Sequence, residues 1–223
     1  MTEVFHAPRL GRRLRDLVNP RLDDDVSWDD SHITGDLSDS FADRLEITGS
    51  RLSDVRLTGS QLHRLRLIDC VVERCELSGA VLEDAAFQRV VFVDCRMSGV
   101  VLTSAAMRHV RLTGCRLDHA SLRMTSANPA IFERCDLRGA DFYAAKLAGC
   151  RLADCDLTTA DFSQATMTGA VLHGSDLTDL VGGAALRGVT IDAAQIVPLA
   201  LAVFDALGIT VSEAEGAELE TNT

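Results

Sequence analysis

Residues 131–160 read IFERC DLRGA DFYAA KLAGC RLADC DLTTA, which are six consecutive units of five residues. The second residue of every unit is Leu or Phe, and the last is Ala or Cys. A spacing of five matches neither the period of an amphipathic helix nor the alternation of a strand. Each unit is therefore predicted to be a short extended piece followed by a corner, so that the chain coils.

The same spacing continues on both sides of this stretch. From Leu37 to Leu177, steps of five visit 29 positions without an insertion, and 27 of them are Leu, Ile, Val, Phe or Met. The position two residues earlier is small in nearly every unit. Each unit thus offers one small and one large side chain to the core, and its other three positions face water.

The seven cysteines all occupy the small position, and their spacing predicts the size of one coil. Four units per coil place like residues above one another at the strand spacing of about 4.8 Å. Stacked parallel thiols neither converge on a metal nor point sulfur at sulfur, so no metal site and no disulfide is predicted. The core ladder that recurs at every fourth unit consists of Cys75, Cys95, Cys115, Cys135 and Cys155.

The formal charge of -11 is unevenly distributed. Residues 37–177 hold 18 acids and 16 bases, whereas residues 178–223 hold 7 acids and 1 base. An acidic chain lacks the Lys and Arg surface that phosphate contacts require, so direct nucleic-acid binding is not expected. No apolar run reaches the length of about 20 residues that spans a membrane, and no export signal is recognisable, so a cytoplasmic location is expected.

The register changes at both ends of the repeat. Trp28 is out of phase with Leu37, which suggests a partial coil, and the step breaks near Val181-Gly182-Gly183. Asp192 and Gln195 have capping-box spacing, and Gly208 is a stop signal, so a helix is predicted within 193–207. We predict an N-terminal cap (1–34), a repeat domain (35–191), a helix and short strand that favour dimerisation (192–211), and an acidic disordered tail (212–223).

This repeat, loosely A(D/N)Lxx, resembles the pentapeptide-repeat family over roughly residues 35–180. The resemblance implies an all-β fold, a right-handed quadrilateral β-helix of four five-residue units per coil, here followed by a short C-terminal α-helix. Both the small residue and the central Leu or Phe would then point into the core.

Enzymatic chemistry is not indicated. The sequence has no phosphate-binding glycine loop, no nucleophile elbow and no metal-binding helix motif, so we expect no cofactor. Its six histidines share no face and are expected to be scattered over the surface. The distinctive surface feature is a pair of carboxylate ladders that recur at every fourth unit. These are Asp136, Asp156 and Asp176 on one face, and Asp141 and Asp161 on the next.

The ladders have two interpretations. Asp could simply be the family's commonest residue before the central Leu, or the ladders could imitate nucleic acid. The ending Leu186-Arg187-Gly188-Val189 with Phe204 to Ile209 resembles gyrase-protecting quinolone-resistance members of the family. That resemblance implies a homodimeric DNA mimic that binds DNA gyrase or topoisomerase IV and protects against quinolones or another topoisomerase poison. Its dimer contact would be Ile196, Leu199, Val203, Phe204 and Leu207.

Charge density limits the mimicry. A rod of about 35 Å compares with duplex DNA carrying on the order of 20 charges, while residues 37–177 net only -2. Outward apolar residues, Val71, Val91 and Ile131 on one face and Val81 and Val101 on another, are not explained by mimicry. The alternative is a rigid interaction scaffold with an unrelated protein partner.

Overall fold

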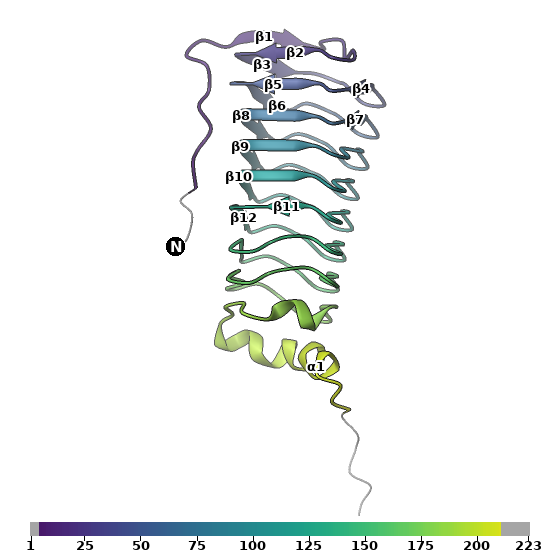
Figure 1. Ribbon diagram of the computed structural model, residues 1–223. Helices are drawn as coiled ribbons and strands as arrows, with labels where there is room; N and C mark the ends of the chain where they lie inside the picture. Colours follow the sequence, from purple (N-terminus) through teal and green to yellow (C-terminus); the bar gives the residue numbers. More distant parts are fainter. Residues whose placement is uncertain (1–4, 211–223) are drawn as a thin grey trace, which may run out of the picture.

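The structure is a computed structural model that describes residues 5–210, and it is a rod of stacked coils (Figure 1). The fold is the expected right-handed quadrilateral β-helix, and every strand pairs in parallel with its neighbours in the sheet. The elements, in chain order, are β1 (Arg15–Val18), β2 (Ser27–Asp29), β3 (Ser31–Thr34), β4 (Phe41–Asp43), β5 (Glu46–Thr48), β6 (Arg51–Ser53), β7 (Gln61–His63), β8 (Arg66–Glu73), β9 (Ala86–Val93), β10 (Ala106–Thr113), β11 (Ser126–Ala127), β12 (Ala130–Glu133), β13 (Arg151–Ala153), the 3-10 turns η1 (Gly183–Leu186) and η2 (Ala193–Gln195), and α1 (Ile196–Ala206).

The register confirms four units per coil. Leu67 of β8 lies beside Phe87 of β9, which lies beside Met107 of β10, so each coil contains four of the five-residue units. Backbone N–H groups of one coil donate to carbonyls of the next throughout the rod, which satisfies the main chain without helices. The irregular Ser126 to Ala130 stretch keeps the count, because Ala127 and Ala130 pair with the equivalent residues one coil earlier.

The core is a stack of the two inward columns. The central residue of each unit from Leu37 to Leu177 is buried, and the small column fills the space beside it. The Phe142 and Phe162 rings stack face to face with centroids 4.7 Å apart. Burial of this kind stabilises the fold by about 25 cal/mol per Å² of apolar surface, and it is shared between all the coils.

The chain turns a corner at the fourth residue of many units, and this residue adopts the left-handed backbone conformation with positive φ. Asp69, Arg89 and His109 have φ angles of 54°, 53° and 55°, and Gly139 occupies an equivalent corner at 61°. An added Cβ at Gly139 would lie 2.7 Å from the exposed His119 ring, which would have to move, so glycine suits this corner in space as well as in conformation. These corners give the coil its square section.

The N-terminal segment does more than close the first coil. β2 and β3 stack on β5 and β6 with a 19-residue offset, and β1 pairs with β3 beyond them. Trp28 is buried beside Ile47 as part of the stack. Residues 5–14, here called the strap, run along the outside of the rod (Figure 1). The sequence pattern did not predict the strap.

The C-terminal end closes with short helices. The offset between coils shortens by one between the pair Asp161–Val181 and the pair Val171–Thr190, so the predicted slip is confirmed and is absorbed by η1. Asp192 and Gln195 form the predicted capping box, and α1 ends before Gly208. Ile209 and Thr210 are not in a strand, so the predicted short strand is wrong for those two positions; Val211 and the tail 212–223 lie outside the described residues.

Candidate interaction surfaces

The cysteine ladder is sealed inside the rod. All seven cysteines are free thiols and buried, and the five that recur at every fourth unit lie in one column. Their sulfur atoms contact backbone carbonyls, as Cys155 does with Phe132 O at 3.5 Å and Ala153 O at 3.3 Å. Burial raises the pKa of both Cys70 and Cys150 to about 11, which disfavours the reactive thiolate. These residues fill the core.

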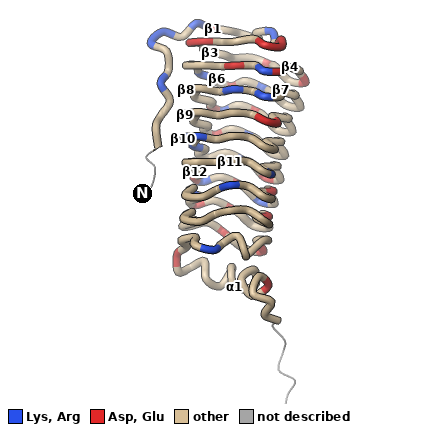
Figure 2. The backbone as a smooth tube through the Cα atoms, viewed as in Figure 1, with Lys and Arg blue, Asp and Glu red and all other residues tan. Residues whose placement is uncertain are grey.

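Ion pairs between coils dominate the N-terminal half. Arg89 binds Asp69 of the previous coil with two bonds of 2.6 and 2.5 Å, and Arg74 binds Asp54 at 3.0 and 2.8 Å. The partners occupy equivalent positions of adjacent coils, so acid and base meet because the coils stack. Acids and bases are interspersed over these coils (Figure 2), which neutralises this part of the surface.

The Asp ladders are also partly neutralised. Arg138 binds Asp136 with two bonds of 2.8 and 2.7 Å and lies 3.5 Å from Asp156. The Arg138 guanidinium lowers the pKa of Asp136 below its usual range. Asp141 is bound by Arg123 at 2.7 Å. Asp136 and Asp141 therefore each accept hydrogen bonds from an arginine of the same chain, a pairing that the sequence pattern did not reveal.

The lower ladder carboxylates accept hydrogen bonds from neighbouring groups of their own turns. Asp176 accepts from both the N–H and the hydroxyl of Thr178, at 3.0 and 2.6 Å, which lowers the pKa of Asp176. Asp161 accepts from the Ser163 N–H at 2.7 Å. Residues 152–186 hold five acids and no Lys or Arg, so the negative field is concentrated in the last coils.

The terminal helix divides the predicted dimer contact. Leu199 is only 6% exposed and Val203 packs against the core, so both contact the coil of their own chain. Ile196, Phe204 and Leu207 remain exposed, together with Val197 and Leu201. The prediction that Leu199 is available to a partner is corrected, because it seals the coil end. The outward face of α1 is apolar.

The outward apolar residues lie on two faces. Phe41 is 57% exposed and begins a row, here called the Phe41 row, that continues through Gln61 to Val81 and Val101. Val71 and Val91, on another face, are half-buried beside the corner along which the strap runs.

The structure corrects the expected exposure of one histidine, His109. His109, expected on the surface, is buried, and its ring meets the His6 ring of the strap with centroids 4.5 Å apart. The strap covers this corner because it folds back over coils that are distant in sequence.

Residues 5–210 contain no group of three His, Cys, Asp or Glu side chains arranged to hold a metal ion. Over the same residues, no helix has the length and apolar character needed to cross a membrane.

Comparison with known families identifies the repeat. The family model "Pentapeptide repeat region" matches residues 45–122 and 65–142, and the model "Pentapeptide repeats (8 copies)" matches residues 145–179. The chain belongs to the pentapeptide-repeat family. This assignment agrees with the five-residue register and the square coil seen in the structure.

Solved pentapeptide-repeat structures are similar to this one at low sequence identity. A trypsin-treated form of QnrB1, a plasmid-mediated fluoroquinolone resistance protein, is 22% identical, with 92% of this chain and 93% of that chain covered and a TM-score of 0.48. HetL, involved in heterocyst differentiation regulation in the cyanobacterium Nostoc, is 19% identical, with 82% and 87% covered and a TM-score of 0.30. No curated protein sequence matches the chain.

Proposed function

We propose that this pentapeptide-repeat protein is a non-enzymatic binding protein that occupies the DNA-binding surface of DNA gyrase or topoisomerase IV. The observation that carries the proposal is the acidic stretch of the last coils, residues 152–186, which lacks Lys and Arg and lies next to an exposed apolar helix. Asp156 and Asp176 lie in adjacent coils about 4.8 Å apart, comparable to the axial phosphate spacing of about 3.4 Å in one DNA strand. The ending that resembles quinolone-resistance members supports the same partner.

Dimerisation through α1 would place two acidic ends side by side. Exposed Ile196, Val197 and Leu201 offer the apolar surface that such a contact needs. The acidic zone of one chain would then continue into that of its partner, so the central part of the dimer carries the mimicry. The neutral N-terminal coils act as rigid arms.

The test is a supercoiling assay with purified gyrase. We expect the protein to inhibit supercoiling and to relieve quinolone-stabilised DNA cleavage. A triple change of Asp156, Asp161 and Asp176 to Asn should abolish both effects and leave the fold intact, because the Asn carbonyl still accepts the turn hydrogen bonds. The matched control is Asp36→Asn, in the same outward row at the other end of the rod. Equal activity of the triple variant would reject the proposed surface.

A second candidate is a scaffold for a different protein, favoured by the Phe41 row. Val81 and Val101 pair across adjacent coils on this face, and Met124 at its edge is 51% exposed. Aliphatic side chains of this kind suit a protein surface and not a topoisomerase groove that binds phosphates. Loss of partner capture by Val101→Lys, with unchanged gyrase inhibition, would separate the scaffold role from the mimic role.

A further inference from the structure

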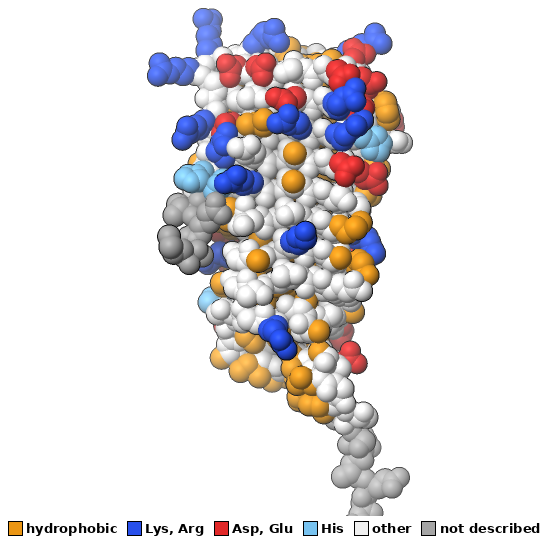
Figure 3. Space-filling view, viewed as in Figure 1, with side chains coloured by type: hydrophobic (Ala, Val, Ile, Leu, Met, Phe, Trp, Pro, Cys, Tyr) orange, Lys and Arg blue, Asp and Glu red, His pale blue; other side chains and the backbone are white. Residues whose placement is uncertain are grey.

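One face of the rod differs from the others in charge. Two outward rows define this face, here called the alanine face: Glu46, Arg66, Ala86, Ala106, Ser126, Lys146 and Thr166 in one row, and Thr48, Ile68, Gln88, Arg108, Asn128, Ala148 and Thr168 in the other. They carry three bases and, apart from Glu46 at the top, no acid. Figure 3 looks onto this face, and its middle shows basic but no acidic side chains.

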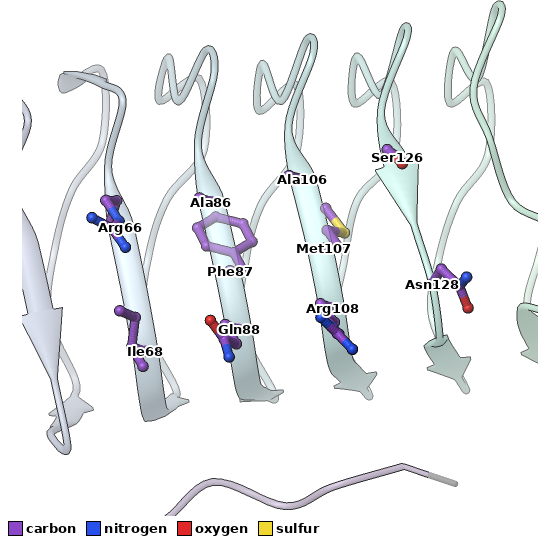
Figure 4. Close-up of a pocket in the computed structure, with 10 residues that line it drawn as sticks. All are labelled: Arg66, Ile68, Ala86, Phe87, Gln88, Ala106, Met107, Arg108, Ser126 and Asn128. Carbon is purple, nitrogen blue, oxygen red and sulfur yellow. The ribbon is translucent and has the colours of Figure 1, made fainter. Parts of the chain in front are cut away.

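The alanine face is hollowed. A groove of about 400 Å³ crosses β8, β9 and β10 and reaches Asn128. The floor of the groove is formed by the small side chains of Ala86 and Ala106. Its edges are lined by the longer side chains of Arg66, Gln88 and Arg108 (Figure 4). The strap runs along the neighbouring corner of the rod, where its Arg9 N–H donates to Asp69 at 3.0 Å and its Gly11 N–H donates to Gly49 O at 2.9 Å.

The groove is shaped and charged for an extended acidic peptide. It runs across the coils, parallel to the rod axis, so an extended chain can follow it for several coils (Figure 4). Arg66, at one end of the groove, pairs with Glu46 at 3.1 Å. The amides of Gln88 and Asn128 and the Arg108 guanidinium, which carries five N–H groups, can donate to carboxylates, and the small floor leaves room for a backbone.

The chain itself supplies such a peptide close by. Ala206, at the end of α1, shares a surface hollow with Arg187, and the following Gly188 lies against Thr168 of the alanine face. The chain therefore leaves α1 at the foot of this face. Residues 212–220 read SEAEGAELE, with four carboxylates and no base.

The chain beyond α1 is long enough to reach the groove. From Thr168 to Gln88 is four coils, or about 19 Å at the strand spacing. Ten extended residues beyond Gly208 span about 33 Å, which covers that distance with residues to spare. We propose that the acidic segment 212–220 docks in the groove of the alanine face of its own chain. Docking would also convert the one base-rich face of the rod into a neutral or acidic one.

The test is thiol protection at the groove floor. Ala106→Cys introduces an exposed thiol into a protein whose seven native thiols are buried, so a neutral maleimide reports on this position alone. We expect the reaction to accelerate on the order of fivefold when Glu213, Glu215, Glu218 and Glu220 are changed to Gln, and similarly in 0.5 M salt, because surface ion pairs are weak and screened. Thr58→Cys, exposed on the opposite face, is the matched control and should react at the same rate in all conditions.

Two results would overturn the proposal. Equal rates at position 106 with acidic and Gln-substituted segments would show that the segment does not occupy the groove. Protection that disappears on dilution would assign the groove to the segment of a second copy. Neither result depends on gyrase, so the proposal fails or stands apart from the proposed function.

Discussion

At the residue scale, the fold uses each side chain for one purpose set by its place in the unit. Cys115 and its equivalents occupy the small inward column, where a thiol behaves as a compact apolar group. Asp69 occupies a corner, where its carboxylate binds Arg89 and also accepts the Arg9 N–H of the strap. The first kind of residue is chemically silent, and the second joins coils together.

The thiols give the first prediction. In the native protein none of the seven should react with Ellman's reagent within minutes, because each is at most 2% exposed and the reagent cannot reach the sulfur. All seven should react in strong denaturant. A native protein with even one rapidly titrating thiol would contradict the sealed ladder.

The second prediction concerns Asp69. Asp69→Asn should lower the free energy of unfolding by about 1–2 kcal/mol, because it leaves the partly buried Arg89 guanidinium without its carboxylate. The Arg89 guanidinium lowers the pKa of Asp69, so the stabilisation is present above the unfolded pKa of about 3.9 and is lost as pH falls through the lower folded value. Urea titrations should show a larger deficit of the variant at pH 7 than at pH 3. The exposed pair of Asp54 and Arg74 is the control, and Asp54→Asn should have little effect.

At the element scale, α1 serves two surfaces at once. Its inward side carries Leu199 and Val203, and the capping glutamine Gln195 donates to Leu172 O and Ser175 O at 2.6 Å, which fixes the helix on the last coil. Its outward side carries Val197 at 80% exposure and Leu201 at 68%. We therefore expect a partner to cover the outward side of α1.

The third prediction separates the two sides of α1. Leu201→Asp should yield monomers in light scattering that keep the circular dichroism spectrum of the folded rod, because this side chain is exposed and contributes little to the coil end. Leu199→Ala should lower the free energy of unfolding by about 2–3 kcal/mol through the cavity it leaves. If the Leu201 variant keeps the mass of the unaltered protein, α1 is not the dimer contact.

At the scale of the whole molecule, each coil contacts only its neighbours. Stability is then a sum over adjacent coils, and a defect in the middle weakens the rod where it occurs. Ion pairs link the N-terminal coils, while the last coils rely on the core and on turn hydrogen bonds such as Asp176 with Thr178. The acidic C-terminal end of the rod is thus joined by fewer ion pairs between coils than the N-terminal end.

The fourth prediction follows from this linear arrangement. Phe142→Ala removes one ring of the stacked pair in a fully buried position and should cost about 3–5 kcal/mol. Because the loss is local, urea unfolding followed by circular dichroism should change from one transition to two. Phe41→Ala, at an exposed position, is the control and should retain a single transition. A single cooperative transition in the Phe142 variant would show stronger long-range coupling than a nearest-neighbour rod allows.

The repeat alone determined the coil of four units, the two core columns and the burial of every cysteine. It could do so because each unit repeats the same local choice, and stacking identical units leaves few alternatives. Local sequence signals also predicted the capping box at Asp192 and Gln195 and the change of register near Gly182.

Only the tertiary structure decided which charges remain available and which apolar residues are covered. Arg138 reaches Asp136 and Asp156, Leu199 turns inward, and the strap lies along a corner that is distant in sequence, as with His6 and His109. None of these contacts is repeated from coil to coil, so no period in the sequence records them. They depend on side-chain reach and on how the two chain ends fold back, which the stacked coils permit but do not specify.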